Sequence, residues 1–286
     1  MNAVTVWDGK PVTEPGLYDM PDREYRAIPA LSGSGVHRLL TNPRTFIEPF
    51  EASEAMRIGT AFHARVLGSD VPVESSGKWA TLSGAAAKAW VAEVDAGGGM
   101  VTLEAWEPRL AAMEAALDRN PEAVRLLYGK GGVNEQAIVS DWNGVPIKGK
   151  LDRFLTFTEG GVVVDLKSSR DPYSDKAIYG YGYDRQVFFY ERLACEAYGI
   201  EPAMPPSIVS VGSSAPHGCV VWQFTEYERA TAYADIDRAL ELYAACTERG
   251  EWPDWAEQGP QSPHLPVWVE RARDNDQDAA AAWLEA

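Results

Sequence analysis

The chain has 286 residues, of which 45% are hydrophobic and 10% aromatic, so it can fill a sizeable core. Its formal net charge of −16, from 42 acidic and 26 basic residues, argues against loose binding of nucleic acid, although a locally basic groove stays compatible with it. Three widely spaced cysteines indicate neither a disulfide framework nor a zinc or iron–sulfur site, and we see neither a membrane span nor a secretory signal, so we expect a cytoplasmic protein.

The first half of the chain reads as mostly helical. Residues 1–30 carry four prolines and little periodicity, so we expect an irregular arm. A short helix is predicted over 31–40, with Ser32 or Ser34 as its N-cap, and another over 53–67. His63 lies on the apolar stripe of the second helix, where a lone histidine is more often a core residue than a ligand. Gly59, one turn earlier, allows another element to come close, and residues 83–125 predict three further helices.

Strands and helices then alternate. Three antiparallel strands are predicted over 134–140, 145–158 and 162–167, and an Asn143-Gly144 hairpin turn joins the first two. A helix over 175–198, strands over 208–213 and 219–224, a helix over 226–248 and a last short helix over 277–284 follow. This order predicts a mixed α/β (α+β) fold, with a central mixed sheet flanked by helices and a helical N-terminal part. We divide the chain into the arm (1–30), one domain (31–270, with a helical part 31–130 and a sheet core 131–250) and a C-terminal tail helix (271–286).

The end of the third strand carries the candidate chemistry. Strand alternation places Asp165 and Lys167 on one face and Leu166 on the other. Asp152, in the preceding strand, offers a second carboxylate, and two carboxylates on adjacent strands suit Mg²⁺ or Mn²⁺. Lys167 can stabilise charge that develops on a phosphate. The alternative is a plain salt bridge at the end of a strand. Glu135, in the first strand, could either reach the metal site or be an exposed edge residue.

A set of short motifs resembles the PD-(D/E)XK nuclease superfamily in its RecB-like branch, and within it the phage RecE-type exonucleases (exodeoxyribonuclease VIII). The motifs are Gly59-x3-His63, Lys150-Leu151-Asp152-Arg153, Asp165-x-Lys167 and Gln186-x3-Tyr190, and the resemblance covers about residues 24–268. Leu151 stands where the proline of the family name would be. The cysteine cluster of the iron–sulfur members is missing, and no nucleotide-binding helicase motif is present.

The resemblance assigns a role to each matching residue. It implies that Asp152, Asp165 and the backbone carbonyl of Leu166 hold Mg²⁺, with Mn²⁺ able to substitute. It also implies that His63 joins the metal site and that Lys167 is the catalytic lysine. Gln186 and Tyr190 would support the site and approach the scissile strand. Their spacing alone places them on one helical face, where Tyr190 could equally be a core residue and Gln186 a boundary residue.

The function implied is a Mg²⁺-dependent DNA exonuclease that degrades linear duplex from its ends, in the 5′→3′ direction. The family implies a partner, a single-strand annealing recombinase, and a ring-shaped homo-oligomer, with a tetramer favoured. The setting would be the cytoplasm of a bacterial host, for a phage- or prophage-type protein. The alternatives are a non-catalytic DNA- or protein-binding module on the same fold, which the net charge favours, and an unrelated α/β protein with chance motifs.

Basic residues near the motifs are candidates for phosphate contacts. We rank three of them first, and four others also lie close to the motifs in sequence. The first three are Arg44, Arg170 and Arg185, and the others are Arg26, Lys148, Lys150 and Arg153. Each could instead be a surface charge that pairs with the acidic excess.

Overall fold

The computed structural model describes residues 3–12, 14–49, 51–69, 71–158 and 160–258. The chain divides into two compact units, Met1–Trp252 and Pro253–Ala286. The first unit contains every predicted site residue, and the described part of the second contains the 3-10 helix η2 (Trp255–Gln258). None of the helices in the described ranges has both the length and the apolar character that crossing a membrane requires.

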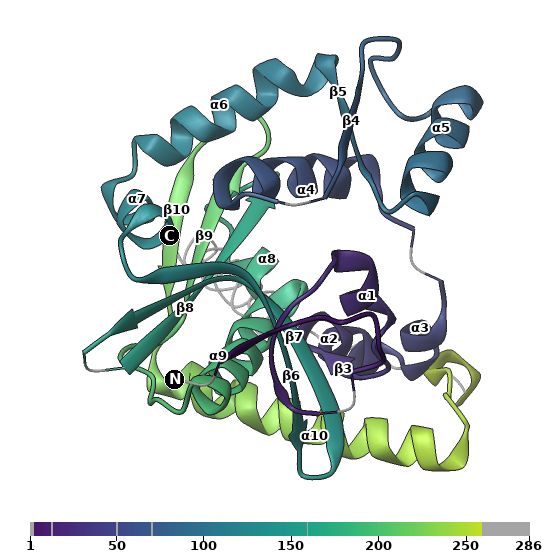
Figure 1. Ribbon diagram of the computed structural model, residues 1–286, viewed down its shortest axis with the longest axis vertical. Coiled ribbons are helices and arrows are strands. Elements are labelled where there is room, and N and C mark those ends of the chain that lie inside the picture. The colour runs from purple at the N-terminus through teal and green to yellow at the C-terminus, as the bar shows by residue number, and fades with distance from the viewer. Residues whose placement is uncertain (1–2, 13, 50, 70, 159, 259–286) are drawn as a thin grey trace, which may run out of the picture. The chain divides into compact units, whose positions relative to one another are not determined.

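A mixed sheet forms the centre of the first unit (Figure 1). Its strands follow the order β1 (Val4–Val6), β2 (Gly16–Asp19), β6 (Gly132–Trp142), β7 (Val145–Phe157), β8 (Gly160–Ser169), β9 (Ser207–Gly212) and β10 (Cys219–Gln223), and β3 (Leu31–Ser32) pairs with β7. The three strands β6, β7 and β8 are antiparallel, β8 and β9 are parallel, and β9 and β10 are antiparallel again. The predicted mixed sheet is confirmed, and so are the three antiparallel strands at its centre.

Helices cover both faces of the sheet (Figure 1). One face packs on α2 (Gly33–Thr41), α9 (Tyr183–Tyr198) and α10 (Glu226–Arg249), and the other on α4 (Glu54–Leu67), α6 (Glu107–Asp118) and α7 (Pro121–Tyr128). The helix α5 (Ala85–Ala96) joins the second core through the short strand β5 (Met100–Leu103) instead. In β8, Val163 belongs to the first core and Val162, Val164 and Leu166 to the second. A strand buried on both faces needs an unbroken apolar run, which explains why this stretch of sequence does not alternate.

Local signals in the sequence set several of these boundaries. Asn143 and Gly144 both have positive φ, 55° and 83°, as the predicted two-residue hairpin turn requires, and the Gly144 amide donates to Asp141 Oδ1 at 2.7 Å. Ser32 caps α2 by accepting from the Gly35 amide at 3.2 Å, which decides between the two predicted caps. Ser53 caps α4, as predicted, by accepting from the Met56 amide.

Some predicted elements were wrong. The arm of residues 1–30 is not irregular, because it contains β1, β2 and α1 (Asp22–Ala27), and β2 pairs with β6 far along the chain. The helix predicted over 175–198 is two helices, α8 (Asp175–Gly180) and α9, separated at Tyr181–Gly182. Two short strands, β4 (Val73–Ser76) and β5 (Met100–Leu103), pair with each other and were not predicted. The last predicted helix, over 277–284, lies outside the described residues.

The remaining short elements join these layers. The helix α3 (Pro43–Ile47) begins directly after α2 and is capped by Asn42, so the end of one helix is also the start of the next. The 3-10 helix η1 (Glu104–Trp106) leads from β5 into α6. The three helices expected over 83–125 are confirmed as α5, α6 and α7, although α7 extends to Tyr128.

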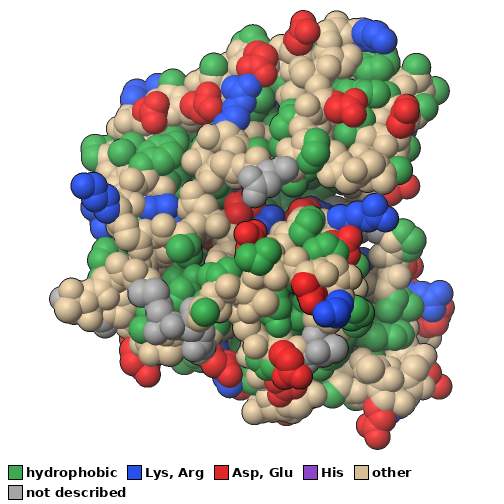
Figure 2. Space-filling model, viewed as in Figure 1, with side chains coloured by type: hydrophobic (Ala, Val, Ile, Leu, Met, Phe, Trp, Pro, Cys, Tyr) green, Lys and Arg blue, Asp and Glu red, His purple; other side chains and the backbone are tan. Residues whose placement is uncertain are grey.

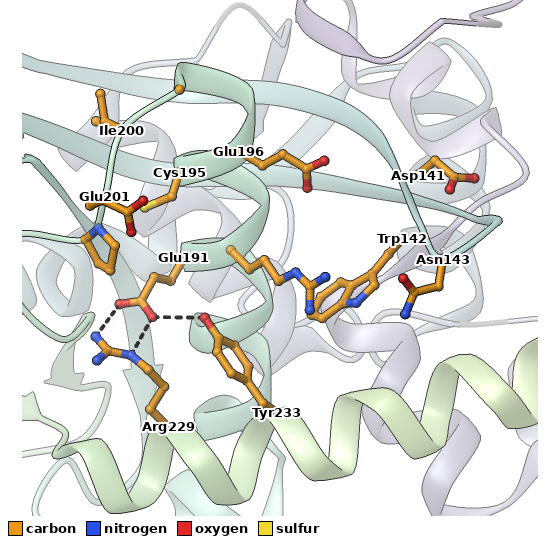
Figure 3. Close-up of a pocket in the computed structure, with 13 residues that line it drawn as sticks. Asp141, Trp142, Asn143, Glu191, Cys195, Glu196, Ile200, Glu201, Arg229 and Tyr233 are labelled. Atoms are coloured by element: carbon orange, nitrogen blue, oxygen red, sulfur yellow. Dashed lines mark hydrogen bonds and ion pairs between the residues drawn. The ribbon is translucent and has the colours of Figure 1, made fainter.

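A buried ion pair ties α9 to α10. Figure 3 shows Arg229 and Tyr233, both on α10, pointing toward Glu191 on α9. Arg229 Nε and Nη2 donate to the two oxygens of Glu191 at 2.8 and 2.9 Å, and Tyr233 Oη donates to Oε1 at 3.3 Å. The Glu191 side chain is only 3% exposed, at the edge of an open pocket of about 700 Å³. This bidentate pair therefore fixes α9 against α10.

We therefore expect Arg229→Ala to lower the free energy of unfolding by about 3–5 kcal/mol, because it leaves a buried carboxylate unpaired. Arg238→Ala is the matched control, since that arginine pairs with Asp235 on the same helix but its side chain is 66% exposed. The Arg238→Ala substitution should lower the free energy of unfolding by less than about 1 kcal/mol. Denaturant unfolding of both variants measures the difference, and equal losses would contradict a stabilising role for the buried pair.

Candidate functional site

The site lies where two central strands separate. From the hairpin inward, β7 pairs with β8 as far as Arg153 and Val164, and in the described residues their pairing ends there. Asp152 and Asp165 are the next residues on the two strands and stand opposite each other in the same register. Beyond this point β7 pairs with β3 and β8 with β9. The separation gives two facing carboxylates room that a continuous pair of strands would not have.

Asp152 closes the gap between the separated strands. Its Oδ2 accepts a hydrogen bond from the Leu166 amide at 2.7 Å, which replaces the lost strand pairing. The same oxygen lies 3.6 Å from His63 Nδ1 on α4. Burial pushes the pKa of Asp152 upward, but His63, Lys167 and the Leu166 amide together hold that pKa below its usual value. The pKa of His63 is raised, because Asp152 outweighs the opposing effect of burial.

Asp165 and Lys167 form a buried pair on the same face of β8. Asp165 is 1% exposed, and its Oδ2 lies 2.5 Å from Lys167 Nζ. Burial raises the pKa of Asp165 to about 6, with Lys167 opposing the shift and Asp152 adding to it. The Asp165 carboxylate in turn keeps the pKa of Lys167 above its usual value against the effect of burial. Asp165 and Lys167 were predicted to lie on the same face of the strand, and their direct contact agrees with that prediction.

A tyrosine that the motifs did not include completes the surroundings of the lysine. Lys167 Nζ lies 4.9 Å from the ring centroid of Tyr183, the first residue of α9. This is cation–π distance, and it holds the ammonium between a carboxylate and an aromatic ring. The sequence could have indicated Tyr183, because it lies three residues before Gln186 and therefore on the same face of the helix.

Gln186 and Tyr190 lie on α9, close to Gly33 and Gly149. Gln186 Nε2 donates to Tyr190 Oη at 3.1 Å, so the pair spaced by four residues does meet. Tyr190 is 6% exposed and belongs to the core, as the simpler interpretation of its position suggested, while Gln186 is partly buried. Burial raises the pKa of Tyr190 well above its usual value, and the charges of Asp165 and Asp152 raise it too. A Cβ on Gly149 would lie 3.1 Å from the Tyr190 ring.

Gly59 serves the close approach that its position predicted. A Cβ on this glycine would lie 2.7 Å from Ser168 Oγ, so only glycine lets α4 pack this closely on the end of β8. Four residues later on the same helix, His63 faces Asp152. The Gly59-x3-His63 motif is therefore both a packing contact and a means of delivering the imidazole to the strands.

Glu135 occupies a distorted point on β6, opposite Asp152. The β6–β7 pairing skips these two residues between Asn134↔Arg153 and Gln136↔Leu151, and Glu135 has φ of +52°. Such a backbone is uncommon for a residue other than glycine. Its Oε2 lies 2.9 Å from Lys150 Nζ, which is also 3.4 Å from Asp22 on α1. Glu135 is thus neither a bare edge residue nor a direct partner of Asp165; it forms an ion pair beside the site.

The elements around the site border a hollow on the molecular surface. Figure 2 shows this hollow between the part that carries α4 and α5 and the part that carries α1 and α2, with acidic and basic side chains at its edge. The contacts of His63 on α4 with Asp152, and of Asp22 on α1 with Lys150, join the two sides through β7.

The residues fit a divalent cation held by few protein ligands. In the described ranges no three His, Cys, Asp or Glu side chains lie close enough together to hold a metal ion. However, Mg²⁺ commonly takes one or two carboxylates and keeps several waters. Asp165 and Asp152 supply two carboxylates on adjacent strands, with Asp165 Oδ2 against Lys167 Nζ, and Leu166 supplies a backbone carbonyl between Asp165 and Lys167. This donor set of hard oxygens suits Mg²⁺ or Mn²⁺.

The basic residues proposed as DNA contacts fall into two groups. Arg170 is exposed, and Arg44 is 56% exposed and 3.9 Å from Glu48. Arg185 is only 15% exposed, with Nη2 3.2 Å from His37 Nδ1 and Nη1 3.6 Å from Asp235 Oδ2. Its position leaves little of the guanidinium available to a phosphate.

Three of the other basic candidates are used inside the protein. Arg153 is 5% exposed and donates to the Leu126 carbonyl and to Asn134 Oδ1. Lys148 Nζ donates to three carbonyls at the end of α1 and just beyond it, those of Tyr25, Arg26 and Ile28. Lys150 pairs with Glu135 and Asp22, and Arg26 pairs with Asp22 but stays 71% exposed.

Comparison with known proteins shows which family the sequence matches. The model of a family described as "PDDEXK-like domain of unknown function (DUF3799)" matches residues 41–260. A crystal structure named "Putative exonuclease" from Eubacterium rectale is similar, with 15% identity, a TM-score of 0.58 and coverage of 87% of this chain and 97% of that one. At this identity the likeness shows the fold alone. The crystal structure of SSO0001 matches at 12% identity over 71% of this chain and 84% of that one, but its TM-score of 0.26 carries no argument. None of the curated proteins matches the sequence.

The contact between α9 and β7 predicts a mutational effect. We expect Gly149→Ala to lower the free energy of unfolding by about 1–3 kcal/mol, because the added Cβ would lie 2.6 Å from Leu193 Cδ2 and 3.1 Å from Tyr190 in a filled core. Gly180→Ala is the control, since a Cβ there meets nothing within 4 Å. It should be neutral or slightly stabilising. Thermal or denaturant unfolding distinguishes them, and a harmless Gly149→Ala would show that α9 is not seated on β7 as described.

Proposed function

Because the chain belongs to the family of PDDEXK-like domains of unknown function (DUF3799), we propose that it is a nuclease that hydrolyses phosphodiester bonds with the help of a divalent metal ion. The predicted membership of the PD-(D/E)XK superfamily is confirmed. The observation that carries the proposal is the facing pair Asp152 and Asp165 at the point where β7 leaves β8, with Lys167 against Asp165. A salt bridge at a strand end would explain Asp165 and Lys167, but it would not explain the second carboxylate, Asp152, which is partly buried and accepts from the Leu166 amide.

The side chains divide the work of such a site. Asp152, Asp165 and the Leu166 carbonyl would hold Mg²⁺, or Mn²⁺ in its place. When bound, the ion would activate a water and neutralise charge on the phosphate. His63 contacts Asp152, and Glu135 contacts Lys150. In these positions the two predicted ligands would hold Asp152 and Lys150 in place instead of binding the ion directly.

Lys167 is the group best placed to meet the reacting phosphate. Its ammonium is held by Asp165 and Tyr183, so it is oriented before substrate arrives and can stabilise negative charge as it develops. Gln186 and Tyr190 fix one another on α9 behind it. Their burial supports a role in holding the site and in shaping the path of the scissile strand rather than in proton transfer.

The finer assignment follows the RecE-type resemblance. We infer a DNA exonuclease that degrades linear duplex from its ends, 5′→3′, and supplies single strands to an annealing recombinase in phage-type recombination. We also infer a homo-oligomeric ring, with a tetramer favoured, working in the cytoplasm of a bacterial host. Of the three basic residues ranked first as phosphate contacts, Arg44 and Arg170 are better placed than Arg185, because their side chains are exposed and that of Arg185 is only 15% exposed.

One observation favours a second function. The formal net charge of −16 suits a binding module on this fold that no longer cuts DNA. The complete set of Asp152, Asp165 and Lys167 speaks against that reading, since each of the three has a defined contact.

The metal requirement can be tested with end-labelled linear duplex and closed circular duplex. We expect the protein to degrade only the linear DNA with Mg²⁺ and neither DNA with EDTA. Asp165→Asn keeps the side-chain shape but removes the charge, so metal binding and cleavage should both collapse. Retention of Mg²⁺-dependent cleavage by Asp165→Asn would exclude this site, and absence of cleavage by the unaltered protein under all metals would favour the binding module.

The role of Lys167 can be separated from binding. We expect Lys167→Ala to lower the turnover number by roughly 10²–10³-fold while the dissociation constant for DNA changes little, because the lysine acts on charge that develops in the transition state. Lys130→Ala, which removes an ammonium outside the site, serves as the control and should leave turnover unchanged. Parallel loss of binding and turnover in Lys167→Ala would instead indicate a simple phosphate contact.

A further inference from the structure

Three tyrosines alternate with glycines between α8 and α9. Residues 179–183 read Tyr-Gly-Tyr-Gly-Tyr. Tyr179 is 48% exposed and Tyr181 is 63% exposed, whereas Tyr183 is partly buried. Large aromatic rings that face solvent give up the stabilisation that burial would supply, so a group of them beside a catalytic site calls for a ligand.

The rings form a path from the catalytic lysine to the surface. Tyr183 lies against Lys167, with 4.9 Å between Nζ and the ring centroid. Tyr181 lies against Tyr183, with 5.5 Å between the centroids and an angle of 36° between the ring planes. The inner ring of the pair, Tyr183, therefore contacts Lys167, and the outer ring, Tyr181, is exposed to solvent.

The turn that places the rings is fixed by glycine. Gly182 has φ of +66°, and a Cβ on it would lie 2.7 Å from His37 Nδ1. The positive φ and the short distance to His37 would each strain the backbone or the packing if any other residue replaced Gly182. The Tyr181 amide donates to the Ala177 carbonyl, and the Gly182 carbonyl accepts from the Gln186 amide at 3.0 Å. The aromatic pair is thus held in place by backbone bonds to both helices, and little ordering would be needed when a ligand binds.

The chemistry of the pair suits a nucleobase. Bases stack on aromatic side chains whatever their sequence, and this contact needs no positive charge. That matters in a chain of net charge −16, where Arg153, Arg185 and Lys148 are occupied by internal partners. Within a duplex both faces of a base are covered by its stacked neighbours, so Tyr181 can stack only on an unpaired base or on the outer face of a terminal pair. An unpaired base fits better, because it can turn to meet a ring that is fixed beside Lys167.

We propose that Tyr181, backed by Tyr183, is a stacking platform for an unpaired base of single-stranded DNA next to the scissile phosphate. The proposal rests on the proposed nuclease function and narrows its substrate to an end with unpaired nucleotides. Tyr181 is then a substrate-positioning residue, and its contribution appears in binding and in the selection of ends rather than in the chemistry at Lys167.

The test uses the full chain carrying Asp152→Asn, which blocks cleavage while leaving an oxygen to accept from the Leu166 amide. The probes are a duplex with a single-stranded overhang that contains 2-aminopurine and a blunt duplex of the same sequence. We expect Tyr181→Ala to weaken binding of the overhang duplex by about 5- to 150-fold, with less effect on the blunt duplex. It should also abolish the quenching of 2-aminopurine, whereas Tyr181→Phe, which keeps the ring, should preserve both.

Phe157→Ala is the matched control, because Phe157 is a 40% exposed ring on β7, five residues or roughly 16 Å from Asp152. If Tyr181→Ala behaves like Phe157→Ala while the Asp152→Asn protein still binds DNA ends, the platform is excluded and the nuclease proposal stands. If the Asp152→Asn protein binds neither probe at any salt concentration, the nuclease proposal itself fails, and the platform with it.

Discussion

The rest of the candidate site depends on two carboxylates on separated strands, Asp165, which is buried, and Asp152, which is partly buried. Asp152 and Asp165 would lose solvation and repel one another if nothing compensated them. Lys167, the Leu166 amide and His63 supply that compensation, and Asp165 Oδ2 is buried against the Lys167 ammonium at 2.5 Å. Removing any one of these partners would leave a carboxylate with little solvation and a like charge nearby, so the candidate site depends on all of them together.

The separation of the strands has consequences on both faces of the sheet. Once β7 leaves β8, it needs another partner, and β3 supplies one. The helices then reach the exposed strand ends only where glycine allows it: Gly59 lets α4 come down on Ser168, and Gly149 lets α9 come down on β7. His63 arrives with the first helix, and Gln186 and Tyr190 arrive with the second. The glycines of the motifs therefore position polar side chains of the candidate site that the glycines do not themselves provide.

The sequence predicted those parts of the structure that depend on local rules. The Asn143-Gly144 turn, the serine caps and the contact of Asp165 with Lys167 follow from backbone preferences and a period of two residues. The short strands of residues 1–30 could not be predicted in this way, since three or four residues carry little pattern and β2 pairs with a strand more than a hundred residues away. Nor does sequence distinguish an arginine that faces solvent, such as Arg170, from one held inside, such as Arg153, because burial depends on which carbonyls happen to surround it.

Charge decides how such a protein can hold DNA. Contacts between cations and phosphates dominate most protein–DNA affinity, but here acidic residues outnumber basic ones and several basic side chains near the site cap carbonyls or pair with carboxylates. Among the basic candidates near the motifs, Arg26, Arg44 and Arg170 keep exposed side chains, whereas Lys148, Lys150 and Arg153 have internal partners. On the proposed nuclease function, contacts that do not depend on charge, such as the stacking of a base on an aromatic ring, would therefore supply affinity that phosphate contacts supply in most DNA-binding proteins.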